Sequence, residues 1–164
     1  MHKHRGMTIV ELLGAIVIFS IASSIIALTI SFIINANQQI IENGQANTTG
    51  MLAIKTLESE ISDLYIPRVT YSDDQSISLV SEYEPSIING NIVDDYSNPK
   101  QLDITFINNQ LIINNEVFSL SPFTLDSSSY IEKRSDNQYI INLVLASEDN
   151  TYTFKTIIDI PVLT

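Results

Sequence analysis

The feature that most constrains this chain is an uncharged apolar run from Leu12 to Ile34. About 20 apolar residues are enough to cross a bilayer as a helix, so this run is long enough to span a membrane. Its only polar side chains are hydroxyls, at Ser20, Ser23, Ser24, Thr29 and Ser31. Hydroxyls of this kind can donate to helix carbonyls one turn back, so they do not disqualify a spanning helix.

A short basic segment, His2-Lys3-His4-Arg5, precedes the run and ends at Gly6. The positive-inside rule places these residues on the cytoplasmic side of a membrane. A cleaved secretory signal would have an apolar core of about 7–15 residues and a small-residue cleavage site after it. Here the core is longer and is followed by Asn35-Ala36-Asn37-Gln38, a poor cleavage context. A plain signal anchor remains an alternative.

Glu11 lies at the mouth of the apolar run. Carrying an ionised acid into a membrane costs roughly 2.5–3.5 kcal/mol on insertion scales, so such residues usually have a partner. A plain signal anchor does not explain why this acid is there. The alternative is that Glu11 lies idle and solvated at the level of the lipid headgroups.

Residues 5–11, Arg-Gly-Met-Thr-Ile-Val-Glu, together with the apolar run resemble the type IV prepilin signal. In that signal a basic leader is cut after glycine, and glutamate stands fifth in the mature chain, as Glu11 does counting from Met7. The family most often has phenylalanine where this chain has Met7, another apolar residue. The resemblance implies that a membrane-embedded prepilin peptidase cuts between Gly6 and Met7 and methylates the new amine of Met7. It also implies that Glu11 pairs with the α-amino group of Met7 in an adjacent subunit during assembly.

The charge balance of the chain is strongly acidic. The net charge is −11, and loss of residues 1–6 leaves 6 Lys and Arg against 19 Asp and Glu, or −13. Proteins that grip phosphate backbones need clustered Lys and Arg, so no direct nucleic-acid binding is expected. The chain has no Cys, which excludes disulfides and Cys-based metal sites.

No catalytic or cofactor site is expected. Both histidines lie in the leader, and the chain has no GxSxG, P-loop or HExxH motif. The acids Asp73-Asp74, Glu82 and Glu84, and Asp94-Asp95 offer oxygen ligands but lack the spacing of a twelve-residue calcium loop, so we interpret them as solvated loop acids. Ser127-Ser128-Ser129 is interpreted as loop composition. The expectation is therefore a protein that is not an enzyme and holds no metal.

A helix is predicted to continue over residues 35–67, with a break near 43–50. That segment, Asn-Gly-Gln-Ala-Asn-Thr-Thr-Gly, is made of weak helix formers. An amphipathic stretch follows, and its predicted core face consists of Met51, Ile54, Leu57, Ile61 and Leu64. Pro67 is predicted to end the helix.

From Val69 onward the apolar period falls to two, which predicts half-buried antiparallel strands. The clearest are residues 102–106, 139–145 and 152–160, with weaker candidates at 77–80 and 117–120. Hairpin turns are predicted at 108–110 and 148–150, because Asn and Asp tolerate left-handed backbone. Residues 82–100 are predicted to be a long loop. A helix face laid on such a sheet gives an α+β head.

The predicted organisation is a leader at 1–6, a transmembrane helix at 7–34, a helix continuation at 35–67 and an antiparallel β head at 68–164. This layout is similar to that of pilins and pseudopilins, in which the second half of a long N-terminal helix packs on an antiparallel sheet. The stretch Leu57-Glu58-Ser59-Glu60-Ile61 and the head are most similar to J-type minor pseudopilins or the corresponding minor pilin of Gram-positive competence pili.

The resemblance implies a minor subunit of a type IV pilus-like or secretion pseudopilus filament, acting in its initiating tip complex. The implied partners are prepilin peptidase, other minor subunits, the major subunit and the membrane. The implied location is a single-pass membrane protein with a cytoplasmic N-terminus and an extracytoplasmic head, and then a filament. Two alternatives stay open: a subunit of a DNA-uptake pilus, and a signal-anchored binding module that never enters a filament.

Overall fold

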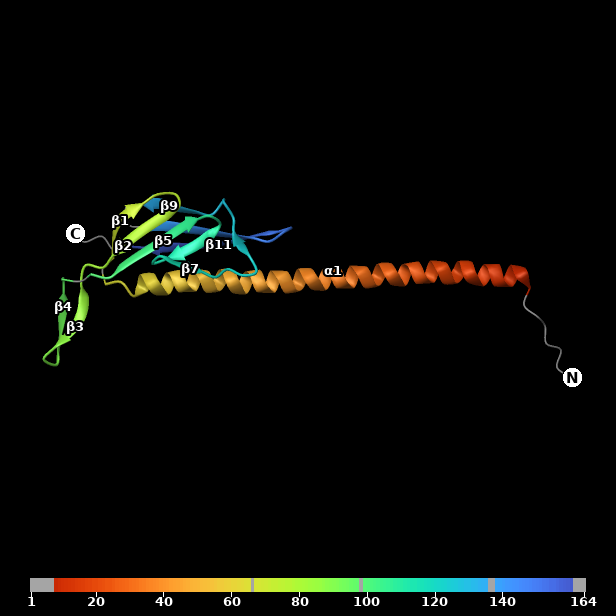
Figure 1. Ribbon diagram of the computed structural model, residues 1–164, viewed down its shortest axis with the longest axis horizontal. Coiled ribbons are helices and arrows are strands. Elements are labelled where there is room, and N and C mark those ends of the chain that lie inside the picture. Colours follow the sequence, from red (N-terminus) through yellow and green to blue (C-terminus); the bar gives the residue numbers. More distant parts are fainter. Residues whose placement is uncertain (1–7, 66, 98, 136–137, 161–164) are drawn as a thin grey trace. The chain divides into compact units, whose positions relative to one another are not determined.

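The computed structural model describes residues 8–65, 67–97, 99–135 and 138–160 (Figure 1). One helix, α1 (Ile9–Ser62), precedes eleven strands within these residues. The chain divides into two units, Met1–Gly44 and Gln45–Thr164. The second unit, called the head below, contains the end of α1 and every strand.

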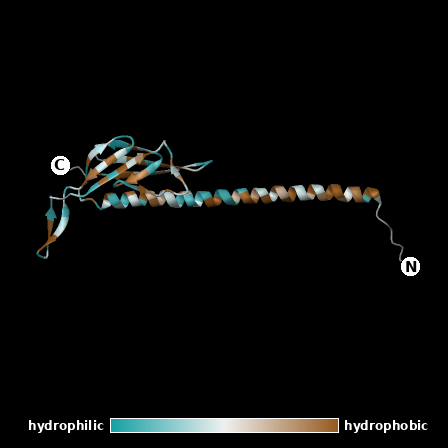
Figure 2. Ribbon diagram, viewed as in Figure 1, coloured by the Kyte–Doolittle hydropathy of each residue, from teal (hydrophilic) through white to brown (hydrophobic). Residues whose placement is uncertain are grey.

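In the first unit, α1 is a solvent-exposed apolar helix. Its large apolar side chains are exposed, and Phe19 and Phe32 are each 73% exposed. Figure 2 shows the hydrophobic colour along this part of the helix. Three of the predicted hydroxyl back-bonds are present: Ser20, Ser24 and Thr29 each donate to the carbonyl four residues earlier, at 2.8–2.9 Å. By length and composition the helix can cross a membrane.

In the head, α1 buries a stripe of small and branched residues. The buried positions are Ala46, Gly50, Ala53, Leu57 and Ile61. The predicted core positions 57 and 61 are confirmed, and Ile54 is partly buried against the core. Met51 is 51% exposed, so its predicted place in the core is wrong. Small residues occupy the inner positions there, and they bring the helix backbone close to the strands.

The predicted break near residues 43–50 is absent, because α1 is helical throughout that segment. Tertiary packing outweighs the weak local propensity. Ala46 is completely buried, and a Cβ added to Gly50 would lie 2.2 Å from the Phe154 ring. Gly50 therefore permits close packing rather than interrupting the helix.

The helix ends at Ser62, before the predicted stop at Pro67. The Leu64 backbone N–H donates to the Ile61 carbonyl at 3.1 Å, a tight i→i−3 turn that commonly closes a helix. This turn also places Leu64 in the core, where it is 6% exposed. The helix continuation predicted over 35–67 is thus shorter than expected.

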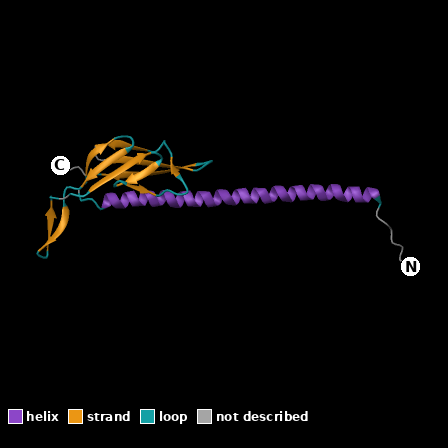
Figure 3. Cartoon of the chain, viewed as in Figure 1, coloured by secondary structure: helices purple, strands orange, loops and turns teal. Residues whose placement is uncertain are grey.

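The strands form three antiparallel sheets (Figure 3). The five-stranded sheet has the order β1 (Arg68–Ser72), β2 (Ser76–Val80), β5 (Gln101–Ile107), β6 (Gln110–Ile113), β7 (Glu116–Phe118). In the four-stranded sheet, β10 (Gln138–Ala146) lies beside β11 (Thr151–Asp159) and also pairs β8 (Thr124–Leu125) and β9 (Tyr130–Ser135). The hairpin β3 (Glu84–Ile88) and β4 (Asn91–Asp95) is the third. The predicted α+β, pilin-like fold is confirmed.

One hydrophobic core unites the two larger sheets with α1. It includes Leu57 from the helix, Leu79 and Ile104 from the first sheet, and Ile141 and Leu143 from the second. Strand β10 is buried on both faces, including Ile140 and Val144, so the half-buried strand predicted there is wrong. Along one edge of β10 the segment after β8 continues the pairing of these two strands, because the Asp126 backbone N–H donates to the Val144 carbonyl at 2.7 Å.

Asparagines with left-handed backbone conformation form several of the hairpin turns. The predicted turn at 108–110 joins β5 to β6, with positive φ at Asn108 (51°) and Asn109 (61°). The predicted turn at 148–150 joins β10 to β11. The long loop predicted over residues 82–100 is wrong, because β3 and β4 form a hairpin there. Its turn has positive φ at Asn89 and Gly90.

Candidate assembly site

The described chain begins at a capped helix terminus. The Thr8 backbone N–H and the Thr8 hydroxyl each donate to Glu11 Oε2 at 2.9 Å. In return, the Glu11 backbone N–H donates to Thr8 Oγ1 at 3.3 Å. This reciprocal pattern is a capping box, in which Thr8 is the N-cap and Glu11 the third helical residue. The box satisfies two backbone donors that a helix start leaves unpaired.

The capping box gives Glu11 a role within its own chain. An acid in the first turn also interacts favourably with the positive end of the helix dipole. Glu11 therefore has a structural role in its own helix, and this role is the same whether the residue lies at the headgroup level or pairs with another subunit. Its side chain stays exposed, so it also remains open to a second partner.

This local contact has a sequence signal of its own, separate from the spacing between Gly6 and Glu11. Thr8-Ile9-Val10-Glu11 matches the capping-box pattern S/T-x-x-E before an apolar run. Gly6 and Met7, the predicted cleavage and methylation residues, lie outside the described residues. Glu11 is thus the one predicted site residue whose geometry the structure gives.

Comparison with protein families gives a match to the prokaryotic N-terminal methylation motif over residues 1–27. This interval includes Gly6, Met7, the capping box and more than half of the apolar run. This match supports a type IV prepilin-like protein. No curated protein and no solved structure gives a significant match. The motif, together with the apolar helix, indicates membrane anchoring and processing by a prepilin peptidase.

Two acids in the head, Asp73 and Asp95, accept hydrogen bonds from their own turns. Asp73 Oδ1 accepts the backbone N–H groups of Gln75 at 2.8 Å and Ser76 at 2.6 Å, and Tyr71 donates its hydroxyl to Asp73 Oδ2 at 2.6 Å. These bonds, that from Tyr71 foremost, lower the pKa of Asp73 to about 2. Asp95 is used similarly, since hydrogen bonds from the hydroxyl and backbone of Ser97 lower its pKa.

Within the described ranges there is no group of three or more His, Cys, Asp or Glu side chains that could hold a metal ion. The interpretation as merely solvated acids needs correction for Asp73 and Asp95, because each accepts hydrogen bonds from its own turn. Their sequence signal is an Asp followed two or three residues later by Ser.

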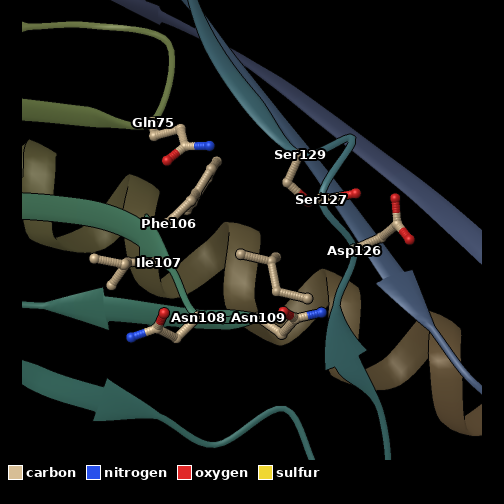
Figure 4. Close-up of a pocket in the computed structure, with 9 residues that line it drawn as sticks. Gln75, Phe106, Ile107, Asn108, Asn109, Asp126, Ser127 and Ser129 are labelled. Carbon is tan, nitrogen blue, oxygen red and sulfur yellow. The ribbon is translucent and has the colours of Figure 1, made fainter.

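A pocket of about 240 Å³ lies where the turn after β5 meets the segment after β8 (Figure 4). Its polar lining includes Asn108, Asn109, Asp126 and Ser129. Two of these groups already bind backbone: Ser129 Oγ accepts the Val144 N–H at 2.9 Å, and Asp126 Oδ1 accepts the Ser128 N–H at 2.9 Å. The pocket therefore lies between two loops. The Asp126 carboxylate and the buried Ser129 hydroxyl in its lining already accept hydrogen bonds from the backbone.

Proposed function

We propose that this protein is a minor pilin or pseudopilin, cut by prepilin peptidase between Gly6 and Met7 and then assembled into a type IV pilus-like or secretion pseudopilus filament. The observation that carries the proposal is the position of Glu11. It stands fifth after Gly6 within the matched motif and in the first turn of an exposed apolar helix. The initiating tip complex of the filament is the proposed place of the subunit.

Assembly rests on a charge pair between two subunits. After cleavage, the new amine of Met7 is methylated and stays cationic, and it neutralises Glu11 of a neighbouring subunit inside the membrane. Removing one partner of such a pair leaves a buried charge that costs roughly 3–5 kcal/mol. Subunits therefore stack only where Met7 of one chain aligns with Glu11 of the next. The capping box holds Glu11 at the helix start until that partner arrives.

The exposed apolar helix supplies the second assembly surface. The large apolar side chains between Leu12 and Ile34 are exposed, and in a filament they would pack against the same helix of other subunits. Before assembly, lipid covers them. The proposed topology is a single pass, with the leader in the cytoplasm and the head on the extracytoplasmic side.

The head is proposed to bind other subunits rather than to catalyse a reaction. Prepilin peptidase, other minor subunits and the major subunit are the proposed partners. In the alternative of a DNA-uptake pilus, the acidic head would be a scaffold and another subunit would contact DNA. The alternative from a different class is a signal-anchored binding module that stays outside filaments.

Incorporation of a Glu11→Ala variant tests the proposal. We expect membrane insertion to be unchanged and incorporation into sheared filaments to be abolished, because the Met7 amine then has no carboxylate partner. Glu116→Ala, which removes an exposed acid from the edge strand β7, is the matched control and should incorporate normally. Normal incorporation of Glu11→Ala would contradict the pairing mechanism.

A further inference from the structure

The hairpin of β3 and β4 is an insertion between two paired strands of the larger sheet. Strands β2 and β5 pair directly, with Val80 opposite Gln101, while the chain between them forms its own two-stranded sheet (Figure 1). Ser81, at the start of the inserted segment, forms hydrogen bonds with Lys100 at its end. Its backbone N–H donates to the Lys100 carbonyl at 2.9 Å, and its hydroxyl oxygen accepts the Lys100 N–H at 2.8 Å. The hairpin thus has a closed base.

Three tyrosines hold the base of the hairpin against the turn that follows α1. The rings of Tyr83, just before β3, and Tyr96, just after β4, have centroids 5.4 Å apart. Tyr65 lies 5.7 Å from Tyr83, and its carbonyl accepts the Glu82 N–H at 2.9 Å. Aromatic pairs at this separation are attractive beyond the area that they bury. The hairpin is therefore positioned by contacts at its base.

One face of the hairpin presents adjacent isoleucines to solvent. The register pairs Ile87 with Ile92 and Pro85 with Asp94, and alternation along each strand puts these four residues on the same face. Ile87 is 77% exposed and Ile92 is 78% exposed, more than any other large apolar side chain in the described head. An apolar pair held on regular structure and left in water is typical of a binding surface.

One acid, Asp94, lies on this apolar face, and Glu84 and Asp95 pair with each other on the opposite face of the hairpin. The hairpin strands carry Glu84, Asp94 and Asp95 and no Lys or Arg. A pocket of about 320 Å³ at the foot of the hairpin is lined by Asp63, Glu84 and Lys100, among others. Its lining therefore contains two acidic side chains and one basic side chain. Complementary surfaces oppose charges of unlike sign, which favours a partner with cationic groups at these positions.

We propose that the Ile87–Ile92 face of the hairpin docks onto a different polypeptide, one that presents an apolar groove bordered by Lys and Arg. A second copy of this chain is a poor occupant, since each mature copy would carry a net charge of −13 from 6 Lys and Arg against 19 Asp and Glu. A lipid surface is also a poor occupant, because anionic headgroups repel the acidic border. The docking does not depend on whether the chain enters a filament.

Site-specific photocrosslinking of the full chain in its native membrane tests this docking. Ile92 is replaced by p-benzoylphenylalanine, the cells are irradiated, and the adduct is identified by mass spectrometry. The control places the same group at Val117, which is 58% exposed on β7. We expect an adduct at position 92 but not at 117, with a peptide of another protein that has apolar residues flanked by Lys or Arg.

Charge reversal supplies the second arm of the test. Asp94→Lys, which reverses the charge on the face of Ile87 and Ile92, should lower the adduct yield about tenfold, because border charges govern the association of such surfaces. The thermal unfolding midpoint should stay unchanged, which shows that the head is folded. An adduct with lipid or with a second copy, an equal yield at position 117, insensitivity to charge reversal, or no adduct would overturn the docking proposal.

The same cells separate this proposal from that of filament assembly. A chain cut at Gly6 and found in filaments, but lacking the adduct, would overturn the docking alone. An adduct of the expected composition from a chain that is never cut would support the docking and contradict the filament.

Discussion

Gly50 of α1 lies so close to Phe154 of β11 that a Cβ at Gly50 would stand 2.2 Å from Cε2 of the phenylalanine ring. A hydrogen bond from Thr156 Oγ1 to Glu58 Oε1, at 2.7 Å, joins the same helix and strand. The absence of a side chain at residue 50 therefore sets how closely the helix approaches the sheet.

Gly50→Ala should destabilise the head. Overpacking costs about 1–3 kcal/mol, and the gain of about 1 kcal/mol in helix propensity offsets only part of it. Gly44→Ala is the matched control, because a Cβ there meets no atom within 4 Å, and it should stabilise the helix. Thermal unfolding followed by the near-ultraviolet signal of tyrosine measures both. If the two variants changed the unfolding midpoint equally, the Phe154 ring would move aside for the new methyl group without loss of stability.

Adding Phe154→Leu should rescue part of the loss caused by Gly50→Ala, because a smaller side chain frees the space that the new methyl group needs. The double variant should therefore be more stable than the sum of the single effects predicts. Strict additivity would contradict a direct clash between residues 50 and 154.

Thr8→Ala separates the two roles of Glu11. Loss of an N-cap costs about 1 kcal/mol, which is less than the cost of an unpaired buried charge. We therefore expect faster amide hydrogen exchange in the first turn of α1 but only a partial fall in filament incorporation. Thr8→Ser retains the hydroxyl and should behave as the parent. If Thr8→Ala and Glu11→Ala reduced incorporation equally, helix capping alone would explain the function of Glu11.

Asp73 should stabilise the head at neutral pH and lose this stabilising effect in acid. Its pKa of about 2 is below the ordinary value of about 3.9, so its contribution is present above pH 4 and is lost as pH falls toward 2. Asp73→Asn should cost about 1 kcal/mol at pH 7, since the group is exposed and screened. The difference in unfolding midpoint between Asp73→Asn and the parent should shrink from pH 4 to pH 2. Asp74→Asn, an equal change of charge next to it, is the control, and a gap that does not change with pH would contradict this role.

Ser81→Ala should loosen the base of the β3–β4 hairpin. The substitution leaves the Lys100 backbone N–H without its acceptor, and loss of this part-buried hydrogen bond costs about 1 kcal/mol. We expect a lower unfolding midpoint and faster proteolysis between residues 82 and 99. Ser72→Ala, at an exposed position of β1 outside the hairpin, is the control. Unchanged proteolysis of the Ser81 variant would mean that the tyrosines alone hold the base.

The sequence was sufficient to predict the elements with strong period and simple turns. Leu57 and Ile61 lie in the core as predicted, and Asn108-Asn109 forms the predicted hairpin turn. Apolar alternation also placed Tyr139, Ile141, Leu143 and Leu145 in the core correctly. These features depend on residues close in sequence, which is why the pattern alone reveals them.

The errors arose where distant segments decide the outcome. Gly50 looked like a helix breaker, but Phe154, about a hundred residues later, makes it a packing site. The Pro85, Gly90 and Asp94-Asp95 cluster looked like a loop, although Asn89-Gly90 between apolar residues is a strong hairpin signal. For the assembly site, the residue spacing predicted Glu11 and a partner in another subunit, but it did not predict the contact with Thr8 in the same chain.

The most direct test of the central proposal is the mass and N-terminal sequence of the protein extracted from membranes, with and without prepilin peptidase in the host. The proposal predicts a mature chain that begins at Met7 and carries one added methyl group when the peptidase is present. Without the peptidase, the chain should begin at Met1. A chain that still begins at Met1 despite active peptidase would contradict processing and leave a signal-anchored domain outside any filament.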